Sequence, residues 1–147
     1  MIRLVDGIEY DAETDGGFTV LTWQLLKERD DSVNISHKKI PAMESHAEFV
    51  AHHPYRTWEA IMAGETPVGS VYLTKRNEIG IFILQEHQGK GYAKAAIKKL
   101  LGQHRPLPGI ASFRPGAFVA NVNPANQASI RLFESLGAKH ISNTYQL

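Results

Sequence analysis

The chain has no cysteine among its 147 residues, which excludes catalysis through a cysteine nucleophile. It also lacks an apolar targeting segment at its start and any apolar run long enough to span a bilayer. These absences together predict a soluble, cytoplasmic protein that has no membrane partner.

Charge of one sign is also lacking. Sixteen lysine and arginine residues stand against fifteen aspartate and glutamate residues, so the net charge is +1. This balance provides no general field for nucleic acid or an anionic membrane, so any bound anion must be held by local groups. A hydrophobic content of 43% over this length predicts one domain, residues 1–147, with a single site.

The most informative segment is a glycine turn between an apolar strand and a helix. Residues 79–84 are almost entirely apolar, and residues 88–93 read Gln-Gly-Lys-Gly-Tyr-Ala. Apolar residues then recur at helical spacing up to Leu101. Glycines have no Cβ to block close approach, so the amides at the start of this helix can converge on an anion. The segment predicts a phosphate-binding loop.

Two common nucleotide-binding motifs do not fit this loop. A P-loop needs Gly-Lys-Ser or Gly-Lys-Thr, but Lys90 is followed by Gly91, so no hydroxyl is present for magnesium. A dinucleotide fingerprint needs a third glycine, and Lys94 stands at that position. Neither a Walker site nor a Rossmann site is expected.

Two blocks of the sequence resemble the GNAT superfamily of acyl-CoA-dependent N-acyltransferases. Residues 88–93 fit the superfamily's pyrophosphate loop, Gln/Arg-x-x-Gly-x-Gly/Ala. Residues 120–138 resemble the strand, Asn-rich turn, helix and Leu-Gly ending that follow this loop in the superfamily. With the strands before the loop, the resemblance covers about half of the chain, residues 68–140. It implies acetyl-CoA as cosubstrate, an amine-bearing acceptor and no metal.

The resemblance implies an α+β (mixed α/β) fold. Its central sheet is mixed and mostly antiparallel, is flanked by about four helices, and has a splayed pair of parallel strands that forms a wedge for CoA. The pattern of the chain agrees and predicts hairpin strands over 58–62, 68–74 and 78–84. Before these hairpins the pattern predicts a strand over 1–5, a hairpin or loop over 6–17, and helices over 19–29 and before Pro54. After them it predicts a strand over 118–122, a helix over 126–136 and a terminal strand over 141–145. The apolar stripe of the helix over 126–136 is expected to join the core.

The resemblance also implies where CoA binds. The pantetheine arm is expected to lie in the wedge as an added strand that pairs with exposed backbone near Leu84. The full set of residues implied in CoA binding is Phe82, Ile83, Leu84, Gln88, Gly89, Lys90, Gly91, Tyr92, Ala93, Asn121, Asn126 and Ser129.

The side chains for acid and base catalysis depart from the superfamily pattern. Phe133 stands where many relatives have a tyrosine that protonates the thiolate, and Asn121 stands where some have a glutamate base. His37 and Tyr145 are the candidate catalytic side chains, and a backbone amide at Ile83 or Leu84 is the expected donor to the oxyanion. Tyr72, Glu78 and Glu86 are further substitutes. The polar loop over residues 32–39 is expected to border the acceptor pocket.

The resulting prediction is direct transfer of an acetyl group from acetyl-CoA to a primary amine of a small molecule, with a lean towards an amino sugar or metabolite. Protein N-termini or lysines are alternative acceptors, and a non-catalytic acyl-CoA-binding module is an alternative of another class. Nucleic acid is not an expected partner. Only ten residues follow Gly137, so a missing edge strand comes from a second subunit of a homodimer, or else the sheet is smaller.

Overall fold

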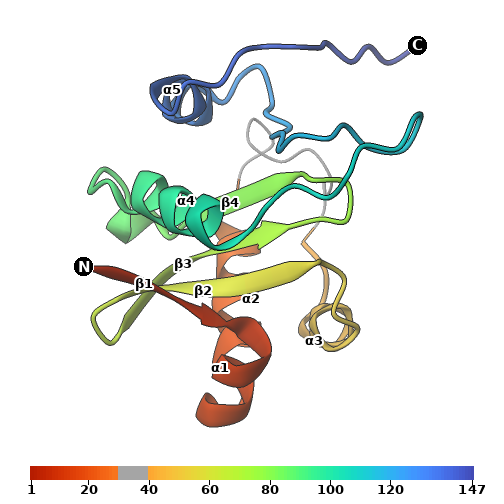
Figure 1. Ribbon diagram of the computed structural model, residues 1–147. Coiled ribbons are helices and arrows are strands. Elements are labelled where there is room, and N and C mark those ends of the chain that lie inside the picture. Colours follow the sequence, from red (N-terminus) through yellow and green to blue (C-terminus); the bar gives the residue numbers. More distant parts are fainter. Residues whose placement is uncertain (30–39) are drawn as a thin grey trace.

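The computed structural model describes residues 1–29 and 40–147 (Figure 1). Within these residues, four strands form one antiparallel sheet in chain order, and the α+β fold class predicted from the sequence is confirmed. The strands are β1 (Ile2–Asp6), β2 (Thr57–Ala63), β3 (Thr66–Leu73) and β4 (Ile79–Ile83). The helices are α1 (Gly7–Thr14), α2 (Gly17–Glu28), α3 (Met43–Ala51), α4 (Tyr92–Gln103), α5 (Gln127–Ser135) and the 3₁₀ turn η1 (Gln85–His87).

The sheet is covered on both faces, and α4 and α2 lie on opposite sides of it (Figure 1). On one face, Ala96 and Leu100 of α4 pack against a cluster that includes Ile61 and Val71. On the other face, Phe18, Leu21 and Leu25 of α2 pack against Ala60, Met62 and Leu84. Alternating side chains along each strand supply the two clusters, which is why the strands read as nearly continuous apolar runs.

The hairpin or loop predicted over residues 6–17 is wrong, because most of this segment is helix α1. Asp6 caps the helix by accepting a hydrogen bond from the amide of Glu9 at 3.1 Å. The carboxylate of Asp11 accepts from both the amide and the hydroxyl of Thr19, at 2.9 and 2.7 Å. The acidic residues that suggested a loop therefore act as caps for α1 and for the start of α2.

The strand predicted over residues 118–122 is present only as a single parallel bridge between Glu78 and Val119. Ile79 donates to the carbonyl oxygen of Val119 at 2.8 Å, and Val119 donates to that of Asn77 at 2.9 Å. The chain then leaves β4. Parallel pairing thus begins beside β4 and stops at once, and no other strand of the described residues pairs with the rest of this edge of β4.

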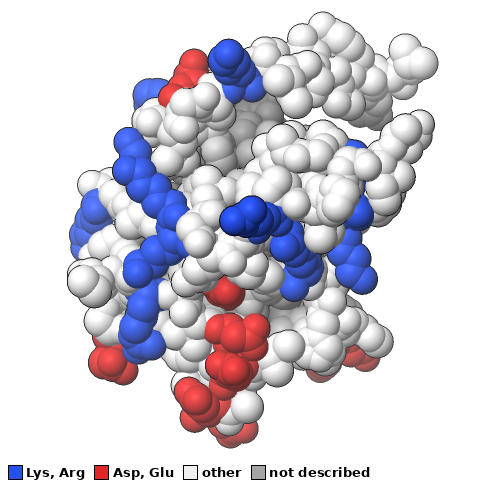
Figure 2. Space-filling view, viewed as in Figure 1, with Lys and Arg blue, Asp and Glu red and all other residues white. Residues whose placement is uncertain are grey.

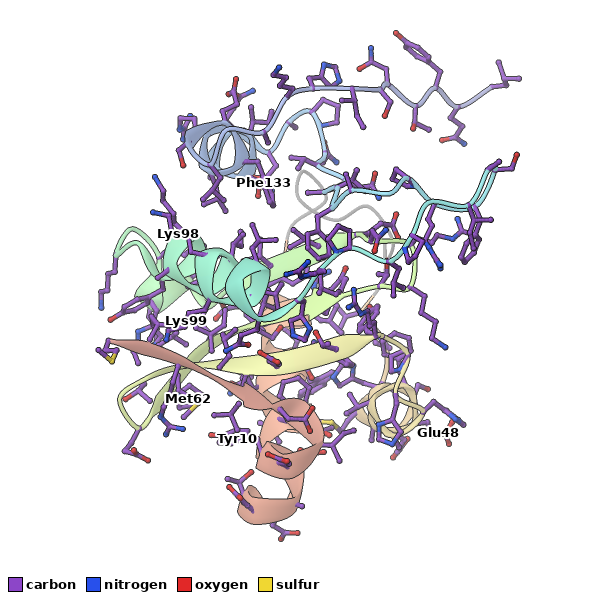
Figure 3. The ribbon with its side chains drawn as sticks, in the orientation of Figure 1. Tyr10, Glu48, Met62, Lys98, Lys99 and Phe133 are labelled. Atoms are coloured by element: carbon purple, nitrogen blue, oxygen red, sulfur yellow. The ribbon has the colours of Figure 1, made fainter. Side chains whose placement is uncertain are left out.

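The C-terminal region also differs from the prediction. The last helix begins at its expected cap, where Asn126 accepts from the amide of Ser129 at 3.1 Å. No residue of α5 is buried, so the core position expected for Phe133 is wrong, and its side chain points from α5 towards the sheet (Figure 3). Residues 141–145 form no strand and are exposed, so the predicted terminal strand is wrong.

A buried asparagine in the β3–β4 turn fixes the path of the chain after α4. Asn77 is fully buried, and its side-chain amide donates to the carbonyl oxygens of Leu107 and Pro115 at 2.9 and 2.8 Å. Its Oδ1 accepts from the amide of Leu107 at 2.8 Å. These three bonds hold the proline-rich segment beside β4 and so determine where Val119 pairs.

We expect Asn77→Ala to lower the free energy of unfolding by about 2 to 4 kcal/mol, because three backbone groups lose the buried side chain that they bond to. Denaturant unfolding monitored by circular dichroism measures this loss. Asn77 has a φ of 63°, so Asn77→Gly is the matched control, which keeps the backbone conformation but removes the amide. Wild-type stability in either variant contradicts the role assigned to the side chain.

Candidate functional site

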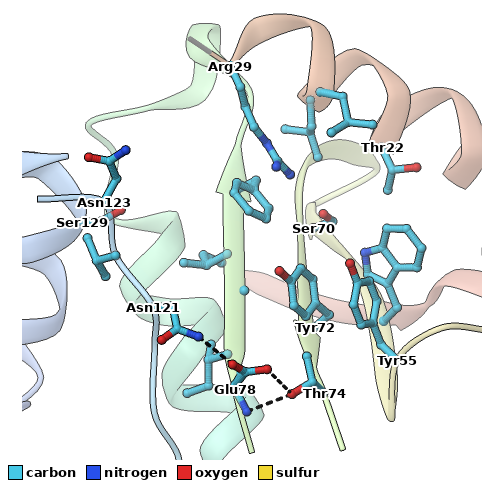
Figure 4. Close-up of a pocket in the computed structure, with 18 of the residues that line it drawn as sticks. Thr22, Arg29, Tyr55, Ser70, Tyr72, Thr74, Glu78, Asn121, Asn123 and Ser129 are labelled. Carbon is cyan, nitrogen blue, oxygen red and sulfur yellow. Dashed lines mark hydrogen bonds between the residues drawn. The ribbon is translucent and has the colours of Figure 1, made fainter. Parts of the chain in front are cut away.

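A cavity of about 530 Å³ lies on the α2 and α3 side of the sheet and reaches the open edge of β4 (Figure 4). Its walls come from α2, α3, β2, β3 and β4, from residues 121–123, and from α5. Segments from the whole length of the chain therefore meet at this one place.

Aromatic rings form one wall of the cavity. Tyr55 and Tyr72 stack in parallel with their centroids 3.9 Å apart, and Trp58 meets Tyr55 edge-on at 4.9 Å. Tyr72 lies across Gly80 of the neighbouring strand, where a Cβ would stand 2.0 Å from the ring. Gly80 is thus required for this ring position. Phe82 continues the wall along β4, at 6.2 Å from Tyr72.

The hydroxyls of Tyr55 and Tyr72 stay protonated at neutral pH. Burial raises the pKa of both groups, and the guanidinium of Arg29 only partly opposes this. The proximity of Tyr72 adds to the rise at Tyr55. Tyr72 therefore keeps its proton at neutral pH.

A carboxylate lies at one end of the cavity. Glu78 accepts hydrogen bonds from the side-chain amide of Asn121 at 2.6 Å and from the hydroxyl of Thr74 at 3.1 Å, as Figure 4 shows. Both bonds orient the carboxylate. This end of the cavity is suited to an ammonium group or to accepting a proton.

A cation lies towards the other end. The guanidinium of Arg29, just after α2, sits 3.5 Å from the ring centroid of Phe82. Burial lowers the pKa of this guanidinium, although Tyr72 and Tyr55 partly offset the effect. Figure 4 shows Arg29 and Glu78 at opposite ends of β4 with Tyr72 between them.

The open edge of β4 presents backbone groups of alternate residues. Leu84 donates to the carbonyl oxygen of Val68 at 2.9 Å, so in an antiparallel pair Phe82 and Leu84 direct their backbone groups to β3. Ile81 and Ile83 direct theirs to the open edge. The amide of Leu84 is therefore not available as the predicted oxyanion donor. Of Phe82, Ile83 and Leu84, which were expected to pair with CoA, only Ile83 directs its backbone groups to the open edge. Ile81, which was not in the predicted set, does so as well.

The glycine turn after β4 has the geometry of an anion cradle. Gly89 and Gly91 have φ values of 77° and 79°, and no atom lies within 4 Å of a Cβ built on either of them. The first helical bond of α4 runs from Ala95 to Gly91, so the amides of Tyr92 and Ala93 remain without a helical partner. Gln88 ties the turn to β4 by donating to the carbonyl oxygen of Ile83 at 3.0 Å. The turn is thus open, exposed and able to receive a diphosphate.

Positive charge accompanies the cradle. Lysines of α4 and the preceding turn lie on one side of the molecule, whereas acidic side chains gather over α1 (Figure 2). Lys98 and Lys99 project from α4 in Figure 3, and Lys90 is exposed within the turn itself. A near-neutral chain thus holds a local basic surface next to the expected anion site.

The structure brings together only part of the predicted set. Phe82, Asn121, Asn126 and Ser129 line the cavity, whereas Gln88 to Ala93 form the neighbouring cradle. His37 and the loop over residues 32–39 lie outside the described residues. Tyr145 is 84% exposed in the C-terminal segment and does not line the cavity.

Sequence reasoning missed Arg29, which stood only at the end of a predicted helix. Tyr55, part of the segment 54–56 that supported the lean towards an amino-sugar or metabolite acceptor, does line the cavity. Glu86, a further candidate, is exposed and lies 3.6 Å from His87, outside the cavity.

Across residues 1–29 and 40–147, no three His, Asp or Glu side chains gather as a metal site would require. No helix in that same part of the chain is both long enough and apolar enough to cross a bilayer.

Comparison with known proteins gives a consistent result. The profile of the acetyltransferase (GNAT) domain family matches residues 19–139, which is most of the chain. A comparison with curated proteins gives no significant match.

Solved structures of similar fold include an acetyltransferase from Thermus thermophilus, with 16% identity, a TM-score of 0.66, and coverage of 97% of this chain and 90% of that one. A protein from Salmonella typhimurium, assigned as an acetyltransferase and solved with its cofactor acetyl-CoA, has 19% identity, a TM-score of 0.59 and coverage of 93% and 78%. A spermidine/spermine N-acetyltransferase from Vibrio cholerae has 19% identity, a TM-score of 0.62 and coverage of 93% and 77%. At these identities the likeness concerns the fold.

Proposed function

The chain belongs to the acetyltransferase (GNAT) family, and from this premise we propose that it moves an acetyl group from acetyl-CoA to a primary amine of a small molecule. The observation that carries the proposal is the adjacency of three features on β4. An open glycine cradle follows the strand, no strand within residues 1–29 and 40–147 pairs with its outer edge beyond Ile79, and a cavity with a carboxylate and protonated tyrosines adjoins that edge.

The residues present fit CoA. The amides of Gly89 to Ala93 and the side chain of Lys90 would hold the diphosphate. The backbone of Ile81 and Ile83 would pair with the pantetheine arm, as an added strand pairs with a sheet edge. Asn126 and Ser129 line the opposite wall. When bound, acetyl-CoA supplies the thioester carbonyl that the amine attacks.

The protein's own groups then have three tasks. Glu78, held by Asn121 and Thr74, accepts a proton from the amine, directly or through one water. The amide of Ile81, which is nearer to Glu78 along the strand than that of Ile83, donates to the oxyanion from the open edge. Tyr72 keeps its proton at neutral pH and donates it to the leaving thiolate, which replaces the tyrosine that relatives carry where this chain has Phe133.

A small molecule is favoured over a protein acceptor by the shape of the site. The cavity of about 530 Å³ is bounded by α2, α3 and α5, and this volume lies in the range of small-molecule pockets, roughly 300 to 1,000 Å³. The amino-sugar or metabolite acceptor, the cytoplasmic location and the homodimer all stay predictions.

The proposal is tested by incubating the protein with acetyl-CoA and a panel of primary amines while free thiol is measured. We expect thiol release that depends on the amine and an acetylated product in mass spectrometry. Tight binding of acetyl-CoA without product for any amine of a broad panel would instead support the non-catalytic module. If the protein does not bind acetyl-CoA at all, the family-based assignment of the cradle is overturned.

A further inference from the structure

Arg29 is a half-buried cation that has no carboxylate partner in the described part of the chain. The ion pairs found there are Arg3 with Glu65 and His87 with Glu86. The Nε of Arg29 is buried and has no hydrogen-bond partner among the described residues. Its guanidinium lies on the ring of Phe82 and lines the cavity.

Such an arrangement is costly for the free protein. A guanidinium removed from water without an anionic partner loses hydration that stacking on one ring only partly replaces. The same loss of hydration lowers the pKa of the Arg29 guanidinium. An anion that enters the cavity would restore the missing interaction, and a guanidinium offers two parallel donors to a carboxylate.

The neighbours of Arg29 match a carboxylate more closely than a phosphate. Tyr55 and Tyr72 are near enough for their electrostatics to reach the guanidinium, and both rings are uncharged at neutral pH. One cation among neutral groups balances a single negative charge, whereas a phosphate monoester carries nearly two. The other charged group that lines the cavity in the described residues is Glu78.

Glu78 and Arg29 define the two ends of the acceptor. Glu78 and Phe82 project to the same face of β4, four residues or about 13 Å of strand apart. We propose that the acceptor is an amine that also carries a remote carboxylate, with Arg29 as the carboxylate-binding residue and Glu78 at the amine end. This inference rests on the proposed acetyl transfer. It disfavours polyamines, which would place a second cation beside Arg29.

The test compares ω-amino acids, from β-alanine to ε-aminocaproate, with their uncharged carboxamides as acceptors. For at least one chain length, we expect the wild-type protein to favour the carboxylate over its amide by about ten- to hundredfold in kcat/KM. Arg29→Met keeps the apolar contact with Phe82 and is expected to abolish this preference by raising KM for the carboxylate alone. Arg29→Lys should retain part of the preference.

Lys27→Met is the matched control. Lys27 lies in α2, which ends just before Arg29, and stacks on Trp23 outside the cavity. The substitution therefore removes the same charge at a neighbouring place that does not line the cavity. It is expected to leave the preference intact. Equal kcat/KM for every acid and its amide in the wild-type protein overturns the proposal. A loss of acetyl-CoA affinity in Arg29→Met with no change in preference also overturns it, because Arg29 would then serve the cosubstrate.

Calorimetric binding of the same pairs in the presence of CoA separates this inference from the proposed function. A carboxylate that binds more tightly than its amide, and only when Arg29 is present, supports the anionic subsite even if no acetyl transfer occurs. Acetyl transfer to amines without any carboxylate preference supports the proposed function and rejects the subsite.

Discussion

Gly91→Val is expected to lower the affinity for acetyl-CoA by about a hundredfold or more while the protein remains folded. Gly91 has a φ of 79° and open space around a Cβ, so the substitution meets no protein atom. The branched side chain instead occupies the space where a diphosphate would approach the amides of Tyr92 and Ala93. It also strains the left-handed backbone that directs these amides. Isothermal titration with acetyl-CoA measures the change.

Gly64→Val is the control for backbone strain alone. Gly64 lies in the β2–β3 turn with a φ of 63° and nothing within 4 Å of a Cβ. We expect both variants to lose a similar amount of unfolding free energy, about 1 to 2 kcal/mol, and only the cradle variant to lose affinity. Unchanged acetyl-CoA affinity in Gly91→Val would remove the turn from the binding site and, with it, the main support for the proposed function.

Glu78→Gln is expected to lower kcat by about a hundredfold or more and leave acetyl-CoA affinity unchanged, because the variant keeps the shape but cannot accept a proton. The one remaining oxygen can still accept from the side-chain amide of Asn121, and the new NH₂ can donate to the hydroxyl oxygen of Thr74, so the fold is expected to persist. Steady-state kinetics with the best amine of the panel, together with titration of acetyl-CoA, separate the two effects.

Glu86→Gln is the matched control for Glu78→Gln. Glu86 is exposed in η1, beside the cradle and outside the cavity, and we expect its loss to leave kcat unchanged. A normal kcat in Glu78→Gln, or an equal loss in both variants, contradicts the role of Glu78 as base.

Much of the framework could be read from local patterns. The strands of the β2–β3–β4 hairpins, the cradle and helix α4 all follow from residues that are close in sequence: alternating or continuous apolar runs, short turns and paired glycines. Helix α1 was missed because aspartates such as Asp6 and Asp11 are common in two kinds of structure. Acidic residues occur in loops and also cap helices, and the choice depended on the contact of Asp11 with Thr19.

The resemblance implied splayed strands with exposed backbone, but the sequence did not show where the pairing beside β4 ends. A strand over 118–122 is consistent with its apolar residues, but the pairing ends after Val119, where Asn77 and the proline-rich segment lead the chain away. Likewise, Leu84 was a reasonable choice as donor until the register with β3 showed its amide bonded to Val68. A shift of one residue along a strand reverses which backbone groups are free.

The sequence by itself determined the family, the glycine turn before α4 and the element order from β2 to α4, because each depends on residues within one or two turns of each other. Only the tertiary structure decided the chemistry of the cavity. Arg29, Tyr55, Tyr72 and Glu78 come from separate elements, and their burial, stacking and hydrogen bonds arise when the sheet is covered by α2. Charge and proton affinity depend on which groups surround a side chain in space, and spacing along the chain does not record those neighbours.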